Sequence, residues 1–221
     1  QTINNWKNDV INMLVKDKKT LNWDVNLDNI ELDRKDVFSL FNLIYLRYAR
    51  KYKKEIAMWG DKTPLNIHFS HFIYPEFKSA KYIFLIRDPR DVALSYKKLL
   101  SHKAVNTNYA IWKWKDSIRN LKYLQKQTDV LIVHYEKLVE SPNQEINRVL
   151  SYLGFPEDDN LIYSKTNASY MGVGEKDHHQ NLNTPISAKS VGKWKDKLSK
   201  KDINLIHKEC YDYLKEFGYP I

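Results

Sequence analysis

The chain contains few of the residues that mark secreted or membrane-spanning proteins. Cys210 is the one cysteine among 221 residues, which excludes an internal disulfide and fits a reducing compartment. No run of about 18 apolar residues occurs, and the first residues do not resemble a signal peptide. These absences predict a soluble chain, in which Cys210 packs in the core at helical spacing from Ile206.

The charge balance favours anionic partners. The formal net charge is +9, and residues 189–201 contain six lysines against one acid, Asp196. Such a surface attracts polyanions, anionic membranes or phosphorylated small molecules, although lysine-rich surfaces are more often only solvated. With 43% hydrophobic and 29% charged residues, the composition is that of an ordinary globular domain.

Short apolar segments alternate with amphipathic ones along the chain. Residues 81–86 and 129–135 have the composition of buried strands. Strands that alternate with helices indicate βαβ units and a parallel sheet in an α/β fold. A long polar loop is expected at residues 164–192. Apolar residues at helical spacing predict helices at about residues 1–18, 37–48, 65–74, 89–100, 111–121, 142–153 and 201–217.

The most specific pattern begins where the first strand ends, at Arg87. Asp88 can cap and Pro89 can open the helix that carries Ser95. Because ligands of open α/β sheets bind beside the carboxyl ends of the strands, we expect Arg87 and Ser95 to converge on one anion. The alternatives are that the alternating charges after Arg87 form only local ion pairs, and that Ser95 is an ordinary helix residue.

Three further residues are candidates for the same chemistry. Lys62 lies in a Gly-Asp-Lys-Thr-Pro turn, and Tyr135 ends the second strand, at the same sheet edge as Arg87. Lys193 lies in a basic segment beside Gly192, where the backbone can approach a ligand closely. The structural alternatives are an exposed turn lysine for Lys62 and a core tyrosine with a solvated hydroxyl for Tyr135.

Together these motifs resemble the sulfotransferases that use 3′-phosphoadenosine 5′-phosphosulfate (PAPS). The resemblance covers roughly residues 58–221 and is closer to the tyrosylprotein and bacterial branches than to the cytosolic small-molecule branch. It implies an α/β, three-layer, P-loop-like fold with a central parallel sheet flanked by helices. It also implies one domain over residues 1–221, with a helical substrate-side region at 1–58 and a cofactor-binding core at 59–221. The matching stretches are Asp-Lys-Thr-Pro at 61–64, Ile-Arg-Asp-Pro-Arg-Asp-Val-Ala-Leu-Ser at 86–95, Val-His-Tyr-Glu-Lys-Leu at 133–138 and Gly-Lys-Trp at 192–194.

The resemblance implies a role for each matching residue. Arg87 and Ser95 would bind the 3′-phosphate of PAPS, Tyr135 would lie near the nucleotide, and Lys193 would contact PAPS from the C-terminal loop. Lys62 matches the family lysine that faces the sulfuryl group during in-line transfer to a hydroxyl or amine. As in phosphoryl transfer, positioning and electrostatics would supply most of the catalysis.

Two family features have no clear counterpart. The P-loop-like segment that holds the 5′-phosphosulfate does not occur before Asp61, so we expect it to precede Gln1, where an anchor or signal could also lie. Cytoplasm is the default location. Pro64 occupies the position of the histidine base of the cytosolic branch. Because the tyrosylprotein branch uses a glutamate upstream of its lysine, the resemblance implies Glu31 as the candidate general base, with His68 and Asp61 as alternatives.

Other functions and partners remain open from the sequence. A P-loop nucleotide kinase would need a Gly-x-x-x-x-Gly-Lys-Ser/Thr loop, which the sequence lacks, and a nucleic-acid-binding module would need aromatics interleaved with the lysines. The adjacent pair His178-His179 is a poor ligand set, so no metal is expected. The acceptor is expected to be a small molecule, a glycan or a peptide, with a homodimer left open. High Lys, Asn, Ile and Tyr content suggests an AT-rich, bacterial genome.

Overall fold

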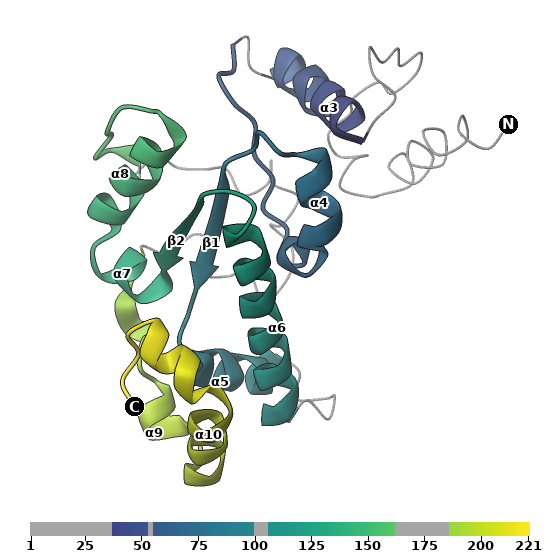
Figure 1. The fold of residues 1–221 in the computed structure, drawn as a ribbon. Coiled ribbons are helices and arrows are strands. Elements are labelled where there is room, and N and C mark those ends of the chain that lie inside the picture. The colour runs from purple at the N-terminus through teal and green to yellow at the C-terminus, as the bar shows by residue number, and fades with distance from the viewer. Residues whose placement is uncertain (1–36, 53–54, 100–105, 162–185) are drawn as a thin grey trace, which may run out of the picture. The chain divides into compact units, whose positions relative to one another are not determined.

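The computed structural model describes residues 37–52, 55–99, 106–161 and 186–221 (Figure 1). These residues fall into two compact units. The N-terminal unit holds residues 37–52, 55–66 and 72–78, and the sheet unit holds residues 67–71, 79–99, 106–161 and 186–221. The elements are α3 (Val37–Tyr52), the 3-10 helix η1 (Asn66–Phe69), α4 (Ser70–Glu76), β1 (Tyr82–Ile86), α5 (Pro89–Leu99), α6 (Thr107–Gln125), β2 (Val130–His134), α7 (Tyr135–Glu140), α8 (Pro142–Leu153), the 3-10 helix η5 (Ala188–Ser190), α9 (Trp194–Lys197) and α10 (Lys200–Glu216).

The sheet unit contains the predicted parallel sheet. Strands β1 and β2 pair in parallel, with a register that runs from Tyr82 opposite Val130 to Ile86 opposite His134. The chain between them forms α5 and α6, which is the helical crossover that parallel pairing requires. Figure 1 shows α6 beside the strands and α5 near the ends at which they finish. The α/β class with helices flanking a parallel sheet is therefore confirmed.

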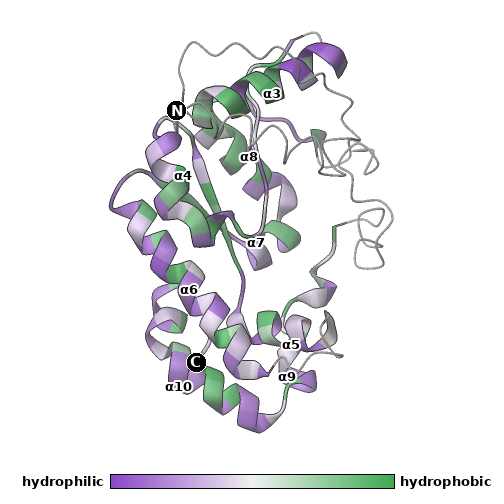
Figure 2. Cartoon of the chain, turned by 90° about the vertical axis from the view of Figure 1, so that its right-hand side faces the viewer, coloured by the Kyte–Doolittle hydropathy of each residue, from purple (hydrophilic) through white to green (hydrophobic). Residues whose placement is uncertain are grey.

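One hydrophobic core holds the sheet unit together. Along β1, Phe84 and Ile86 are buried while Ile83 and Leu85 are exposed, as the two-residue period of a strand requires. Burial of Cys210, which is 1% exposed, raises the pKa of its thiol to about 11 and confirms that it packs in the core. Figure 2 shows both apolar and polar colours along α10, the pattern of a helix with one buried face. The helices contribute Ala93, Leu94, Ala110, Ile111, Trp114, Ile118, Leu121, Ile206, Cys210 and Leu214 to the core.

Local capping explains where the helices begin and end. The Asp88 carboxylate accepts a hydrogen bond from the Arg90 backbone N–H at 2.8 Å, so α5 begins at Pro89 as predicted. Helix α8 ends at Gly154, whose φ of +84° lies in the left-handed region that favours glycine. In the described part of the chain, no helix combines the length and apolar character needed to cross a membrane.

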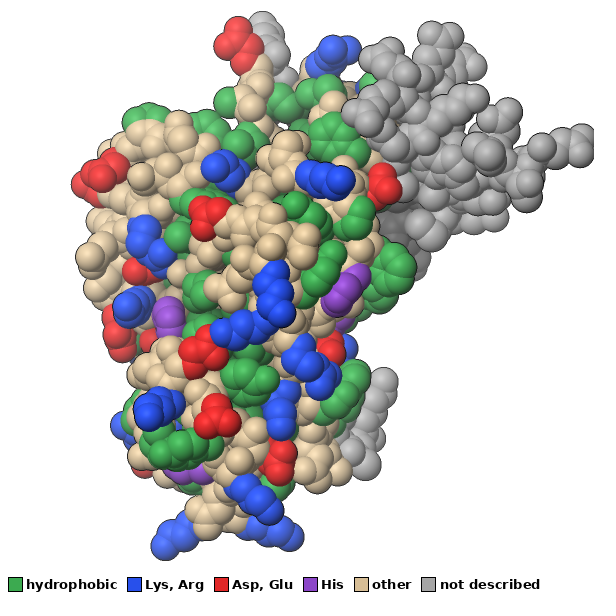
Figure 3. All heavy atoms as spheres, viewed as in Figure 1, with side chains coloured by type: hydrophobic (Ala, Val, Ile, Leu, Met, Phe, Trp, Pro, Cys, Tyr) green, Lys and Arg blue, Asp and Glu red, His purple; other side chains and the backbone are tan. Residues whose placement is uncertain are grey.

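The surface of the described residues carries charges of both signs. Figure 3 shows basic side chains interspersed with acidic ones on the face viewed in Figure 1. Several basic and acidic side chains form ion pairs between helices, such as Lys115 of α6 with Glu209 of α10 at 3.3 Å. The positive charge of the described residues is thus partly neutralised.

Candidate active site

Arg87 lies at the carboxyl end of β1, where its backbone and side chain are both fixed. Its carbonyl oxygen accepts a hydrogen bond from the Trp114 indole N–H at 2.9 Å. Its guanidinium lies over the Tyr135 ring, 4.4 Å from the centroid. Because Ile86 is opposite His134 in the register, Arg87 and Tyr135 directly follow the paired ends of the two strands, and the predicted shared edge is confirmed. Strand β2 ends at His134, so Tyr135 is the first residue of α7 and does not end the strand as expected.

The Arg87 side chain is only partly hydrogen-bonded within the described part of the chain. The Arg87 Nη2 group donates to the Ser190 carbonyl oxygen at 2.7 Å, and the hydroxyl groups of Tyr135 and Ser190 are hydrogen-bonded at 2.7 Å. The Nε group is buried and has no hydrogen-bond partner among the described residues. Buried guanidinium donors are normally paired, so this orphan N–H is a place where an acceptor from a ligand fits.

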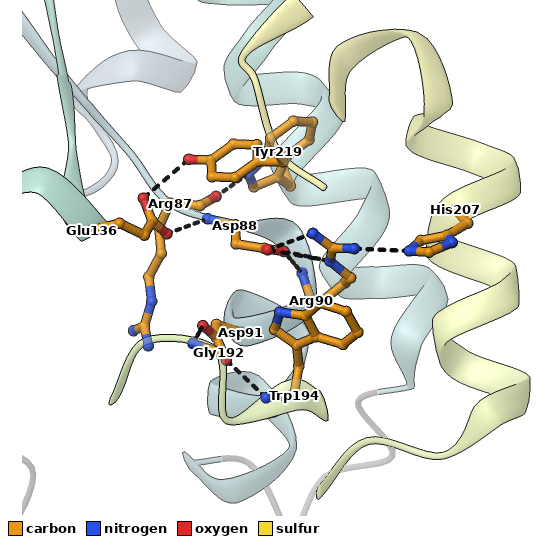
Figure 4. Close-up of polar contacts among 10 residues, drawn as sticks. Arg87, Asp88, Arg90, Asp91, Glu136, Gly192, Trp194, His207 and Tyr219 are labelled. Carbon is orange, nitrogen blue, oxygen red and sulfur yellow. Dashed lines mark hydrogen bonds and ion pairs between the residues drawn. The ribbon is translucent and has the colours of Figure 1, made fainter. Parts of the chain in front are cut away.

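The charges that follow Arg87 form a separate, buried ion pair. The Asp88 carboxylate accepts from Arg90 Nε at 2.9 Å and from Arg90 Nη2 at 2.7 Å (Figure 4). Arg90 is 0% exposed; its guanidinium lies over the Trp194 ring at 3.9 Å, and its Nη1 contacts His207 Nε2 at 2.8 Å. The interpretation as local ion pairs therefore holds for Arg90, while Arg87 takes no part in them.

Glu136 connects three segments of the chain near Arg87. One oxygen of its carboxylate accepts from the Asp88 backbone N–H at 2.9 Å, and the other accepts from the Tyr219 hydroxyl at 3.3 Å (Figure 4). Burial, and next the charge of Glu136, raise the pKa of the Tyr219 hydroxyl, which therefore stays a donor at neutral pH. This contact ties the end of β1 to α7 and to the C-terminal end of the chain.

The segment that carries Lys193 is held against α5. The Asp91 carboxylate accepts from the backbone N–H of Gly192 at 2.7 Å and from that of Trp194 at 3.0 Å. Gly192 has a φ of +69°, which favours glycine at this turn. Ser95 is half-buried and lies four residues after Asp91 on α5, so the two side chains share the helix face that meets this segment.

Lys62 lies in the N-terminal unit, in a turn organised by Asp61. The Asp61 carboxylate accepts hydrogen bonds from Tyr45 Oη at 3.2 Å, Thr63 Oγ1 at 3.4 Å and Asn66 Nδ2 at 2.6 Å. Lys62 is exposed within this turn. Burial, and next the charge of Asp61, raise the pKa of the Tyr45 hydroxyl, so that hydroxyl remains a donor.

The candidate bases have different surroundings. Glu31 lies outside the described residues. His68 Nδ1 lies 2.5 Å from a carboxylate oxygen of Asp116, in the sheet unit. A hydrogen bond from Arg119, the largest contribution, lowers the pKa of Asp116, and a hydrogen bond from His68 acts in the same direction. His68 is therefore tied to α6 through an ionised carboxylate.

Comparison with known proteins identifies the family. A sequence model described as "Sulfotransferase family" matches residues 6–159 of the chain. The chain belongs to the sulfotransferase family. The resemblance expected from the sequence motifs is thereby confirmed, and the match covers the Arg87–Ser95 element and Tyr135.

Individual relatives are distant. The chain is 23% identical over 151 residues to a protein-tyrosine sulfotransferase of Drosophila melanogaster, covering 61% of the chain and 29% of that protein. It is 24% identical over 216 residues to the nodulation protein NoeE of Sinorhizobium fredii, covering 85% of the chain and 50% of that protein. The sulfotransferase domain of the Synechococcus PCC 7002 olefin synthase has the same fold, with a TM-score of 0.64 and 23% identity over 83% of the chain and 65% of that structure.

Sequence reasoning missed several residues of this candidate site. Asp91, Glu136 and Ser190 fix the backbone around Arg87 and Lys193, but none of them has an isolated signal in the sequence. Asp91 could in principle have been predicted from the sequence, because it lies one helical turn before Ser95. The other contacts depend on tertiary pairings that no local spacing encodes.

Proposed function

We propose that the protein transfers a sulfuryl group from PAPS to a hydroxyl or amine acceptor, by in-line displacement. The observation that carries the proposal is the unpartnered, buried Nε donor of Arg87 at the carboxyl edge of the sheet. An anionic group bound there would receive a charge-assisted hydrogen bond from a guanidinium whose orientation Tyr135 and Ser190 already fix. Ligands of open α/β sheets bind at this edge.

The residues present fit the 3′-phosphate end of PAPS. Arg87 supplies the planar fork that suits phosphate oxygens, and Ser95 supplies a hydroxyl from the helix that follows. Tyr135 offers an aromatic face and a hydroxyl beside the nucleotide. Lys193 adds a cation from the segment that Asp91 holds. Each assignment rests on the resemblance of the motifs together with the position of the residue.

PAPS supplies the activated sulfuryl group when it is bound. The part of the chain that would act on it is Lys62, whose ammonium neutralises negative charge on the sulfuryl oxygens. Asp61 uses both carboxylate oxygens to hold this turn. The resemblance to the tyrosylprotein branch makes Glu31 our preferred general base, with His68, whose Nδ1 is held by Asp116, as the alternative. A base in that role takes the proton of the acceptor hydroxyl or amine.

The names of the relatives support one class of acceptor. Matched proteins include a protein-tyrosine sulfotransferase and a 3-beta-hydroxysteroid sulfotransferase of Cavia porcellus, which is 21% identical over 199 residues. Both names describe a hydroxyl acceptor, on a peptide in one case and on a small molecule in the other. We therefore favour a hydroxyl over an amine as the acceptor.

Titration calorimetry with adenosine 3′,5′-bisphosphate tests the proposal. The wild-type protein should bind this compound, which is what PAPS becomes after sulfuryl transfer, and Arg87→Ala should weaken binding roughly 10- to 150-fold, the value of one charge-assisted hydrogen bond. Arg87→Lys keeps the positive charge but loses the planar guanidinium, so its affinity should lie between those of the wild-type and Arg87→Ala proteins. Arg119→Ala is the matched control, because it removes an exposed arginine of the same unit.

The possible outcomes test the use of PAPS and the assignment of Arg87 separately. Absence of binding by the wild-type protein would contradict the use of PAPS. Equal affinity of the wild-type and Arg87→Ala proteins would contradict the assignment of Arg87. Tighter binding of adenosine triphosphate than of the bisphosphate would favour a kinase instead.

A further inference from the structure

Asp91 is a buried acid beside a proposed anion site, where a negative charge is unfavourable for binding. It is 2% exposed, and both of its carboxylate oxygens accept hydrogen bonds from backbone amides of the segment that carries Lys193. Figure 4 shows the carboxylate of Asp91 facing Gly192 and Trp194 across the gap between α5 and this segment. A carboxylate that accepts two amide N–H groups fixes the backbone between them.

The residue between the two bound amides is Lys193. Its backbone therefore has little freedom to turn, and the direction in which its side chain leaves the chain is set by Asp91. The other end of the same segment is held independently, because Arg87 donates to the Ser190 carbonyl oxygen at 2.7 Å and Tyr135 contacts the Ser190 hydroxyl at 2.7 Å. Residues 190–194 are thus fixed by three side chains of the β1 and β2 ends and of α5.

We propose that Asp91 is a positioning residue, which orients Lys193 toward the nucleotide by holding the amides of Gly192 and Trp194. This inference rests on the proposed function, since the value of the orientation depends on a bound nucleotide. Asp91 also couples two parts of the site that are distant in sequence, the helix that carries Ser95 and the segment that carries Lys193.

A purely structural role makes a different prediction. Asp91 lies in the first turn of α5, where an acid stabilises a helix through the dipole. In that case Asp91→Asn would lower the thermal midpoint but would leave nucleotide affinity unchanged or raise it, because a negative charge near an anion has been removed. The positioning role predicts weaker binding. Only the positioning role therefore predicts a loss of affinity.

The first measurement needs no nucleotide. Hydrogen exchange of the Gly192 and Trp194 amides should be slow in the wild-type protein. At least one of the two should exchange at least tenfold faster in Asp91→Asn, whose side-chain amide offers one acceptor oxygen instead of two. Asp196→Asn is the control, because it neutralises an exposed acid in the same segment. Unchanged protection of both amides in Asp91→Asn would overturn the proposal whatever the protein binds.

The second measurement is titration with adenosine 3′,5′-bisphosphate. We expect about tenfold weaker binding for Asp91→Asn and for Lys193→Ala, with no further loss in the double variant, because both substitutions remove the same contact. Asp196→Asn should bind at least as tightly as wild type. The positioning role would be overturned if the two losses in affinity multiplied in the double variant. It would also be overturned if Asp91→Asn bound as tightly as the wild-type protein. If the wild-type protein does not bind, the proposed function fails, and with it the nucleotide-orienting role of Asp91.

Discussion

Replacement of Asp88 should destabilise the sheet unit more than most single substitutions do. The guanidinium of Arg90 is 0% exposed, and Asp88 is the only carboxylate that contacts it among the described residues. Without Asp88 the guanidinium keeps only the Trp194 ring at 3.9 Å and His207 Nε2 at 2.8 Å. Neither partner is negatively charged, so Asp88→Ala leaves a buried charge without compensation.

The size of the effect follows from this burial. Removing one partner of a buried ion pair costs about 3–5 kcal/mol of stability. For a domain of this length, a loss of that size lowers the thermal midpoint by about 6–20 °C. Asp88→Asn should cost less, because the amide oxygen can still cap α5 at the Arg90 backbone N–H and accept from the guanidinium.

Thermal unfolding followed by circular dichroism measures these differences. Adding Arg90→Met to Asp88→Ala should recover part of the loss, because the uncompensated charge is removed as well. Glu157→Ala, which removes an exposed acid of the same unit, should stay within about 0.5 kcal/mol of wild type. A midpoint shift below about 2 °C for Asp88→Ala, or a further loss in the double variant, would refute the reasoning.

Two predictions concern titratable groups of the C-terminal helix. Although burial alone raises it, hydrogen bonds from Lys97 and two hydroxyl groups lower the pKa of Asp202 to about 2. Such a shift is worth about 2.4 kcal/mol, which solvent screening of the exposed part reduces to about 1–2 kcal/mol. Asp202→Asn should therefore lose that much stability in urea unfolding at pH 7 and only a small part of it at pH 2, where the carboxyl group of the folded protein is already about half protonated. Burial, and next the charge of Arg90, lower the pKa of His207 below 6.5. The unfolded state therefore binds the proton first, stability falls as pH drops below 6.5, and the midpoint of His207→Gln measured at pH 7.5 and 5.5 should fall less than that of wild type.

The sequence predicts those elements whose boundaries depend on the spacing of neighbouring residues. The apolar run of β1 and the Asp-Pro start of α5 are set by neighbouring residues, so both boundaries were found. Helices α7 and α9 were missed, because at 6 and 4 residues they are too short for a helical period to be read. The helix expected at residues 65–74 is a 3-10 turn followed by α4. The helix expected at residues 1–18 lies outside the described residues.

The site was predictable only in its outline. Parallel pairing alone brings Arg87 and Tyr135 to one edge, since the ends of adjacent parallel strands meet. The contact between Asp91 and Gly192 spans 101 residues and that between Arg90 and His207 spans 117, and no periodicity connects such positions. The roles of Lys62, Ser95 and Lys193 stay predictions, and the titration of Lys193→Ala addresses the last of them.

The arrangement of acids around the site explains why Arg87 can still bind an anion. Three acids, Asp88, Asp91 and Glu136, accept hydrogen bonds from backbone amides, so each fixes a turn of the site. Asp88 also neutralises Arg90, which is thereby confined to the core. No carboxylate of the described residues contacts Arg87, whose charge is met only by a carbonyl oxygen and an aromatic ring. An anion that arrives at this edge therefore meets a cation already oriented and not yet neutralised, which is the condition for strong binding.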